Sequence, residues 1–348
     1  MARSETLLAE RPPALEPGRV LAVRDLQTFF FTEAGVVKAV NGVTLGLAEG
    51  ETLAIVGESG SGKSVTGLTV MRLLARTSGR VVGGSVAFRS RDGETLDLLA
   101  LPEAQMQRLR GRDIAMIFQD PMSSLNPMFT VGEQIAESIR IHKGRDRRAA
   151  RQEALSLLRE VGISDPEARI RAYPHQLSGG MRQRVMIALA LACGPRLLIA
   201  DEPTTALDVT IQAQIIALLK DVQQRHRMAM IFITHDLKLV GEVADRVAVM
   251  YASQVVEEGP VADVLAAPRH PYTRALLDCI PRRDYDADHT GLKPIPGLLP
   301  SPLDPPEGCR FHARCTFAEP RCAAVEPALE AVDAAHDVRC LRWRELSL

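Results

Sequence analysis

The sequence predicts an α/β fold with a parallel sheet, because short apolar segments alternate with segments of helical periodicity. Apolar runs typical of buried strands occupy residues 52–56, 197–200 and 230–233. Between these runs, residues 63–75 and residues 211–224 place apolar side chains at helical spacing. This alternation is typical of strand–helix–strand units, whose strands lie parallel in one sheet.

Further segments extend this pattern. Residues 20–31 and 36–47 are rich in β-branched and aromatic side chains and predict strands. Residues 114–118 form another apolar run that predicts a strand. We expect all three to belong to the same α/β domain.

The middle of the chain predicts helices. From residue 131 to about 192 the apolar positions follow a helical period, with breaks expected at Gly144, at 162–166 and at Pro174. We therefore expect an α-helical subdomain, over about 125–192, inserted into the α/β domain.

The character of the chain changes near residue 260. Prolines crowd residues 260–306, and four of the six cysteines lie beyond residue 308. We divide the chain into an N-terminal extension (1–18), an α/β domain (19–262) and a small, loop-rich C-terminal domain with four cysteines (263–348).

The composition excludes several classes of protein. The chain has 348 residues, of which 46% are hydrophobic and 24% charged, which excludes a disordered chain, a collagen and a long coiled coil. A net charge of -1 provides no basic field, so no nucleic-acid partner is expected. No apolar run reaches the roughly 20 residues of a spanning helix. The first residues lack the apolar core of a signal peptide, so we expect a cytoplasmic protein with reduced cysteines.

One glycine-rich segment predicts a phosphate site. The residues that match the pattern G-x-x-x-x-G-K-[ST] are Gly57, Glu58, Ser59, Gly60, Ser61, Gly62, Lys63 and Ser64. The segment lies between a predicted strand and a predicted helix, where its backbone N–H groups can surround phosphates. Lys63 is expected to contact the β- and γ-phosphates of ATP, and the Ser64 hydroxyl to bind Mg²⁺.

Two adjacent carboxylates follow the strand predicted at 197–200. Asp201 is expected to hold Mg²⁺, and Glu202 to polarise the attacking water as a general base. The carboxyl ends of strands are where open α/β sheets bind ligands. An ordinary helix-capping pair is the alternative, which the phosphate segment makes less favourable.

The segment Leu177-Ser178-Gly179-Gly180-Met181 resembles the signature loop of the ATP-binding-cassette ATPases, which ends in Gln in the family pattern. The resemblance implies a phosphate-loop ATPase with an inserted helical subdomain. It also implies a head-to-tail pair of ATPases, in which Ser178, Gly179 and Gly180 of one subunit bind the γ-phosphate held by the other.

Further family motifs follow in order. Gln119 resembles the glutamine that contacts Mg²⁺ and water and senses the membrane subunits. Asp208, in the segment 206–208, resembles a residue that bridges two ATPase subunits, and His235 a residue that contacts the γ-phosphate. Phe30, one of three consecutive phenylalanines, resembles the residue on which adenine stacks.

Two segments narrow the resemblance to the oligopeptide/dipeptide permease ATPases, a branch that includes nickel importers. They are residues 119–127 and the run that starts His270-Pro271-Tyr272. The branch implies two transmembrane permease subunits, a second ATPase subunit and a periplasmic solute-binding protein, at the cytoplasmic face of the membrane. An importer ATPase of the same branch for nickel or another small solute remains an alternative. A soluble ATPase of DNA repair or translation is disfavoured, because the chain has one phosphate loop and no long heptad run.

The last four cysteines form the pattern C-x5-C-x6-C-x17-C, at Cys309, Cys315, Cys322 and Cys340. This spacing fits neither a common zinc finger nor the usual ferredoxin runs. Four thiols in a short proline-rich segment suggest a metal centre that stabilises a unit without its own core. Some members of the branch carry a [4Fe–4S] cluster there, so this cluster is expected, with zinc and unmetallated thiols as alternatives.

Overall fold

The structure is a computed structural model that describes residues 15–74, 77–120, 124–205, 207–280 and 294–348. Most of the expected N-terminal extension, part of the 119–127 segment and Ala206 lie outside the described residues.

A central sheet has the strand order β11-β12-β10-β9-β3-β8-β7-β6. Its five parallel strands are β9 (Arg246–Tyr251), β3 (Thr52–Val56), β8 (Ala229–Thr234), β7 (Leu197–Asp201) and β6 (Ile114–Ile117). The predicted parallel sheet is therefore confirmed. Three antiparallel strands extend one edge: β10 (Gln254–Pro260), β12 (Asp337–Val338) and β11 (Glu330–Ala331).

Strands β1 and β2 belong to a second sheet, with the order β2-β1-β4-β5 and antiparallel pairing. Its strands are β1 (Arg19–Thr32), β2 (Gly35–Ala48), β4 (Gly79–Arg89) and β5 (Thr95–Asp97). The first two were expected as strands, but nothing in their composition showed that they form a separate sheet. A tight turn between Thr32 and Gly35 brings them back on themselves, which favours antiparallel pairing.

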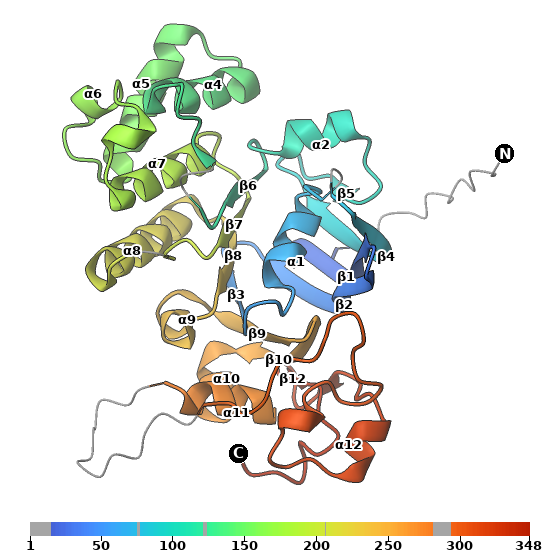
Figure 1. Ribbon diagram of the computed structural model, residues 1–348. Coiled ribbons are helices and arrows are strands. Elements are labelled where there is room, and N and C mark those ends of the chain that lie inside the picture. Colours follow the sequence, from blue (N-terminus) through green and yellow to red (C-terminus); the bar gives the residue numbers. More distant parts are fainter. Residues whose placement is uncertain (1–14, 75–76, 121–123, 206, 281–293) are drawn as a thin grey trace, which may run out of the picture.

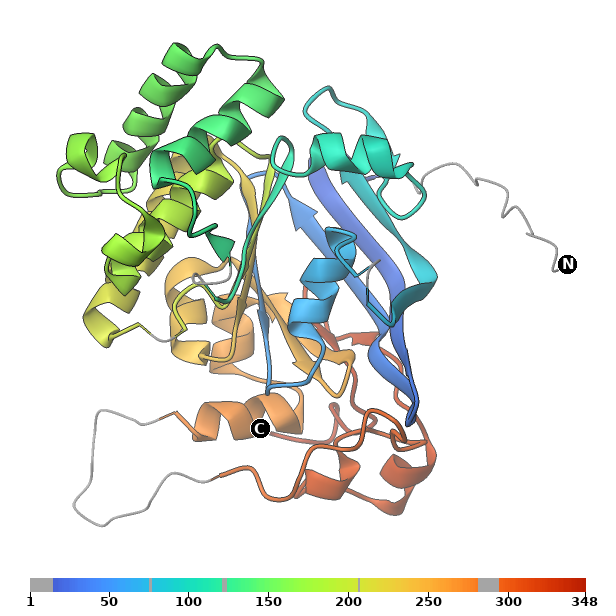
Figure 2. The ribbon, with the colours of Figure 1, turned by 45° about the horizontal axis from the view of Figure 1, so that its top comes forward.

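Helix α1 (Lys63–Val70) lies between the two sheets, as Figures 1 and 2 show. One hydrophobic cluster joins α1, the four-stranded sheet and alternate residues of the central strands, such as Ile231 and Ile233. Met230 and Phe232, which point the other way, join a cluster with the helices on the far face. Helix α1 ends earlier than the expected residue 75, because Arg72 takes a left-handed backbone conformation.

The predicted helical block is confirmed. Its helices are α4 (Val131–Lys143), α5 (Arg147–Glu160), α6 (Pro166–Arg169), the 3₁₀ turn η1 (Pro174–Gln176) and α7 (Gly179–Leu191). Gly144 ends α4 in a left-handed conformation, as expected of a glycine just after a helix. At the other end, Thr130 and Glu133 form a reciprocal capping box.

The remaining helices of the described residues are α2 (Glu103–Leu109), α8 (Val209–His226), α9 (Leu237–Val243), α10 (Val261–Ala266), α11 (Pro271–Asp278), η2 (His312–Arg314) and α12 (Pro320–Ala324). Among the residues that the structure describes, no helix has both the length and the apolar character that crossing a bilayer requires.

The C-terminal segment shares its core with the α/β domain. Strand β12 pairs with β10, and the rings of Tyr251, Tyr272 and Phe311 pack together with centroid distances of 4.6 to 5.3 Å. The sequence suggested a unit without its own core, and these aromatic contacts are the packing that it uses.

Candidate active site

The phosphate loop connects β3 to α1 and depends on two glycines. Gly57 and Gly62 have φ values of 151° and 100°, which side-chain-bearing residues rarely adopt. A Cβ atom at Gly57 would collide with the carbonyl oxygen of Met250, and one at Gly62 with that of Ala39. Glycine at these positions thus lets the loop close against β9 and β2.

Lys63 lies inside this loop and is buried. Its Nζ donates hydrogen bonds to the carbonyl oxygens of Gly57 at 2.8 Å and Glu58 at 3.0 Å. Burial lowers the pKa of Lys63, whereas the nearby carboxylates of Glu202 and Asp201 raise it. The Lys63 amine therefore lies beside the backbone N–H groups at the start of α1. A phosphate bound there would contact both.

Ser64 and Asp201 are brought together as the sequence predicts. The Ser64 Oγ donates a hydrogen bond to Asp201 Oδ1 at 2.8 Å. Burial raises the pKa of Asp201, and the hydrogen bond from Ser64 opposes this. Two such oxygen atoms are ligands that Mg²⁺ prefers, and phosphate oxygens or water usually complete its shell.

Glu202 is the meeting point of three side chains. Its Oε2 accepts hydrogen bonds from Gln119 Nε2 at 3.1 Å and Thr205 Oγ1 at 2.8 Å, and lies 3.3 Å from His235 Nδ1. Glu202 has a φ of 45°, and its backbone N–H donates to the carbonyl oxygen of Ile233. The structure thus places Gln119 and His235 around the expected general base. The sequence did not predict a role for Thr205 at this site. The only available signal was that Thr205 follows Glu202 by three residues.

The signature residues lie on the helical lobe. Ser178 caps α7, and its Oγ accepts a hydrogen bond from the Met181 N–H at 3.3 Å. Asp208 caps α8 in the same way, by accepting from the N–H of Ile211 at 2.9 Å. No hydrogen bond or ion pair among the described residues joins Ser178, Gly179 or Gly180 to the phosphate loop. Among the described residues, no polar contact therefore links the two halves of the predicted site.

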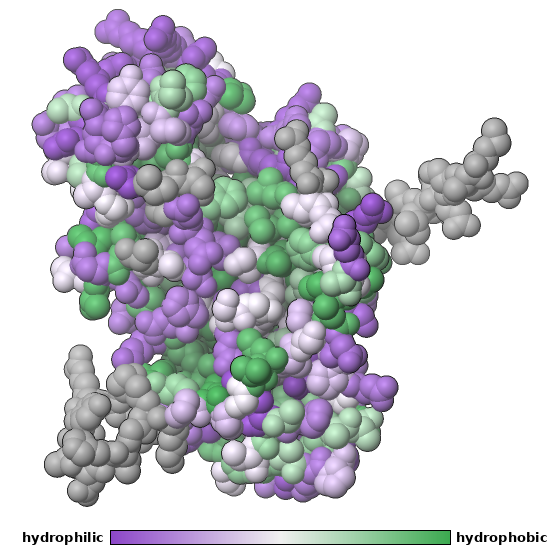
Figure 3. Space-filling view, viewed as in Figure 1, coloured by the Kyte–Doolittle hydropathy of each residue, from purple (hydrophilic) through white to green (hydrophobic). Residues whose placement is uncertain are grey.

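Phe30 lies on β1, opposite Gly79. A Cβ atom added at Gly79 would come within 2.8 Å of the Phe30 ring. Phe31 points to the other face and is half exposed, with the Arg80 guanidinium 5.9 Å from its ring centre. Figure 3 shows hydrophobic side chains gathered over α1 and the four-stranded sheet, whereas the helical lobe is mostly hydrophilic. This apolar surface suits the flat face of a nucleotide base.

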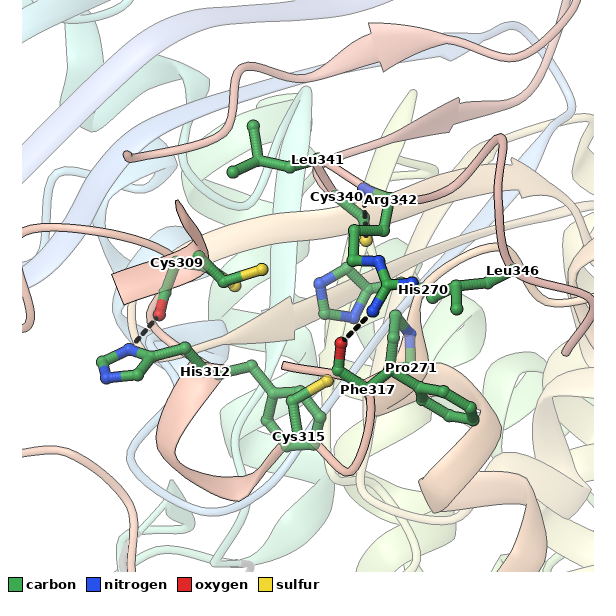
Figure 4. Close-up of a pocket in the computed structure, with 12 residues that line it drawn as sticks. His270, Pro271, Cys309, His312, Cys315, Phe317, Cys340, Leu341, Arg342 and Leu346 are labelled. Atoms are coloured by element: carbon green, nitrogen blue, oxygen red, sulfur yellow. Dashed lines mark hydrogen bonds between the residues drawn. The ribbon is translucent and has the colours of Figure 1, made fainter. Parts of the chain in front are cut away.

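The four C-terminal cysteines line one pocket, with His270, Phe311 and Phe317 among its walls. Figure 4 shows the sulfur atoms of Cys309, Cys315 and Cys340 turned toward the same space. Burial raises the pKa of the Cys309 and Cys340 thiols to about 11. However, no group of three or more His, Cys, Asp or Glu side chains in the described part of the chain is arranged to hold a metal ion. The expected metal centre is therefore not confirmed. Cys193 is buried and Cys279 half-buried, both outside this pocket.

In the sequence, the His-Pro-Tyr run indicates only the resemblance to the permease branch, whereas in the structure it reaches the phosphate loop. His270 caps α11, since its Nδ1 accepts a hydrogen bond from the Tyr272 N–H at 3.0 Å. The Tyr272 hydroxyl in turn accepts a hydrogen bond from the N–H of Glu58 at 3.0 Å. Arg314 forms an ion pair with the carboxylate of the same Glu58. No local sequence pattern indicates either contact.

Two family models match parts of this chain. Residues 40–205 match the family model described as ABC transporter, and residues 256–322 match the one described as oligopeptide/dipeptide transporter, C-terminal region. The chain is 51% identical to a putative peptide import ATP-binding protein of Brucella melitensis, over 94% of this chain and 98% of that one.

The chain belongs to the ABC transporter family. It is an ABC-type ATPase that also carries the C-terminal region of the oligopeptide/dipeptide branch. The dipeptide transport ATP-binding protein DppD of Escherichia coli is 49% identical to this ABC ATPase, over 92% of this chain and 96% of that one. The Bacillus subtilis protein of the same name is 50% identical, over 92% and 94%.

Solved structures show the same fold. A dimeric ATP-binding cassette in a post-hydrolysis state, bound to ADP and Pi, is similar with a TM-score of 0.61 and 26% identity. That match covers 69% of this chain and 98% of the cassette. A Clostridium perfringens protein that is part of an ABC transporter complex is similar with a TM-score of 0.59 and 26% identity, over 72% and 91%.

Proposed function

We propose that this ABC ATPase is the ATP-hydrolysing subunit of an importer for di- and oligopeptides. The observation that carries the proposal is the similarity to dipeptide and peptide import ATP-binding proteins, at 49–51% identity over more than nine tenths of the chain. The C-terminal region of the oligopeptide/dipeptide branch supports it further. A nickel importer would belong to the same branch, but these relatives are named for peptides.

The residues of the site would divide the work of hydrolysis. The loop from Gly57 to Ser64 and its Lys63 would bind the phosphates of ATP, with Phe30 against the adenine. Ser64 and Asp201 would hold the magnesium ion that accompanies ATP, with Gln119 nearby. The ion supplies positive charge at the β- and γ-phosphates.

Glu202 would take a proton from the attacking water as general base. Gln119 and His235 touch the same carboxylate oxygen and would orient the water and the γ-phosphate. The products are ADP and phosphate, and their release would reopen the site.

A second ATPase subunit would complete each site. Ser178, Gly179 and Gly180 make no bond to the phosphate loop of their own chain among the described residues, and the similar cassette structure is dimeric. We therefore infer a head-to-tail pair in which these residues reach the partner's ATP. Asp208, at the start of α8 near the signature helix, would lie at the interface.

The other expected partners are two transmembrane permease subunits and a periplasmic solute-binding protein. Gln119 and the helical lobe would face the permeases, which would place the ATPase on the cytoplasmic face of the membrane. Closure of the ATPase pair would then drive the permeases between two conformations. We also propose the domain boundaries expected from the sequence. These divide the chain into an N-terminal extension (1–18), an ATPase domain (19–262) and a C-terminal domain (263–348).

The cysteine pocket would hold a [4Fe–4S] cluster. Four cysteines line it, and the N–H of Arg342 donates a hydrogen bond to Cys340 Sγ at 3.4 Å, as is common around thiolate ligands. A single zinc ion needs four sulfurs within about 2.3 Å of one point. The described cysteines do not have that arrangement. A cluster binds each thiolate through a separate iron, so its ligands can lie farther apart. Four thiolates are the donor set that such a cluster takes, which supports the proposal.

Uptake in cells tests the proposed substrate. A strain without this subunit, complemented with the wild-type chain, should regain uptake of labelled di- and oligopeptides and show no change in nickel uptake. Recovery of nickel uptake alone would assign the chain to the metal branch. Recovery of neither, at normal expression of the permease subunits, would contradict the proposal.

A further inference from the structure

The C-terminal region holds the second residue of the phosphate loop at two points. The backbone N–H of Glu58 donates a hydrogen bond to the Tyr272 hydroxyl at 3.0 Å. The Glu58 carboxylate accepts two hydrogen bonds from Arg314, at 2.7 and 3.0 Å. A bidentate pair of this kind fixes direction as well as distance, since the guanidinium and the carboxylate are both planar.

Arg314 is itself held in place. Its side chain is 6% exposed, its Nε donates to the carbonyl oxygen of Pro296 at 2.8 Å, and one terminal nitrogen reaches the Tyr251 hydroxyl at 3.3 Å. Its guanidinium also lies 5.7 Å from the centre of the Tyr251 ring. Arg314 thus cannot follow Glu58 if the loop moves, and it lies in the turn between Cys309 and Cys315.

Tyr272 is equally rigid. It is fully buried, and its ring packs against Tyr251 at 4.6 Å and Phe311 at 5.3 Å between centroids. Its hydroxyl therefore offers a fixed acceptor to the phosphate loop from α11, a helix more than 200 residues away in the sequence.

Both contacts bear on Lys63. The Glu58 carbonyl oxygen accepts a hydrogen bond from Lys63 Nζ at 3.0 Å, and the next residue along the loop is Ser59. Together with the Gly57 carbonyl oxygen, Glu58 thus sets where the amine lies, and it directs the N–H groups that follow it in the loop. Small displacements of such groups strongly weaken binding and catalysis in sites that depend on preorganised donors.

We propose that Arg314 and Tyr272 are positioning residues for ATP, which hold the phosphate loop in its binding shape through Glu58. The inference rests on the proposed ATPase function and makes the C-terminal region part of the nucleotide site. This positioning role differs from a merely structural role of Arg314 and Tyr272. In a structural role, loss of their contacts would lower the stability of the fold and leave the affinity for ATP unchanged.

Charge alone gives a different expectation from positioning. If Arg314 acted only by neutralising Glu58 near the phosphates, Glu58→Gln would remove a repulsive charge and strengthen ATP binding. If Arg314 acts by positioning, Glu58→Gln weakens ATP binding, because the bidentate pair is lost. The variant that combines Arg314→Gln with Glu58→Gln should then bind ATP no more weakly than either single variant, since both substitutions remove the same interaction.

The experiment measures the Kd of a fluorescent ATP analogue with Mg²⁺, and the melting temperature, for the full-length chain. Arg314→Gln and Glu58→Gln should each raise the Kd about tenfold, and the double variant by about the same factor. Tyr272→Phe should also raise the Kd, and Arg314→Lys should raise it less than Arg314→Gln. The control is Arg321→Gln, an exposed arginine of the same region that pairs with Glu345 and should leave the Kd unchanged.

Three results would overturn the inference. Arg314→Gln and Glu58→Gln could leave the Kd within about twofold of the wild-type value, or Glu58→Gln could bind the analogue more tightly. The third result is a Kd of the double variant that equals the product of the two single effects. Should Arg314→Gln fail to fold, Arg314→Lys and Tyr272→Phe decide by the same criterion. A wild-type chain that does not bind the analogue would contradict the proposed ATPase function instead, so the two failures are distinguishable.

Discussion

The Glu202 carboxylate oxygen Oε2 lies 3.3 Å from Nδ1 of His235. Both residues follow the carboxyl ends of neighbouring parallel strands, β7 and β8, and Gln119 reaches the same oxygen from the end of β6. Three consecutive strands of the sheet thus deliver one side chain each to a single oxygen atom. This is the edge at which open α/β sheets bind their ligands.

Thr205 should assist Glu202 by orienting it. Its hydroxyl donates to Glu202 Oε2 at 2.8 Å, so Thr205→Val would leave the carboxylate with one donor fewer. We expect hydrolysis to fall by about threefold to tenfold, with recovery in Thr205→Ser. Steady-state phosphate release by the purified transporter measures this. Equal rates in Thr205→Val and wild type would show that the hydroxyl does not orient the base.

Gly62→Ala should abolish nucleotide binding. The added methyl group would meet the Ala39 carbonyl oxygen, and the φ of 100° is unfavourable for alanine. Gly93→Ala is the matched control, because Gly93 also has a positive φ, of 85°, but faces open space. The control should cost about 1 kcal/mol of stability and leave binding intact. Normal binding of a fluorescent ATP analogue by Gly62→Ala would contradict the loop geometry.

His270 should make stability depend on pH. Burial lowers its pKa from 6.5 to about 4, although Glu257 opposes the shift. The folded protein therefore keeps His270 neutral, while the unfolded chain takes up a proton below pH 6.5. This contribution is complete at neutral pH and is lost as the pH falls from about 6.5 toward 4, by at most about 3 kcal/mol.

Urea denaturation between pH 4.5 and 7.5 measures this dependence. His270→Asn keeps a side-chain acceptor for the helix cap but cannot titrate, so it should lose less stability on acidification than the wild-type chain. The exposed His175 provides a control, and His175→Asn should behave like wild type. An unchanged slope in His270→Asn would rule out His270 as the source.

Cys322→Ser should remove the metal from the C-terminal region. The anaerobically purified wild-type chain is expected to contain iron and acid-labile sulfide and to absorb visible light. Cys279→Ser is the matched control, because Cys279 lies outside the pocket of four cysteines. Zinc without sulfide would favour the alternative metal, and a metal-free wild-type chain would contradict the proposed cluster.

The sequence predicted best what depends on local pattern. Apolar runs located β3, β7 and β8, and glycine or proline marked the breaks around Gly144 and Pro174. It left β4 unassigned, because this strand contains Gly79, Gly83 and Gly84 and exposes Val81 and Val82, so neither alternation nor an apolar run is visible.

Long-range contacts could not be predicted. Arg314 and Glu58 are separated by 256 positions, and nothing near either residue indicates the other. The separate antiparallel sheet was missed for a similar reason, since composition predicts a strand but not its partners. The signature loop was found only through its resemblance to a family, because a Ser-Gly-Gly turn at a helix start is also an ordinary cap.

The most direct test of the account is Glu202→Gln in the reconstituted transporter, with its permeases and binding protein in vesicles. ATP hydrolysis and labelled dipeptide uptake are measured together, with the exposed Glu242→Gln as control. The variant should still bind ATP, while hydrolysis falls at least about 100-fold and uptake stops with it. Hydrolysis at the wild-type rate would contradict the role of Glu202, and uptake that continues without hydrolysis would contradict the proposed coupling.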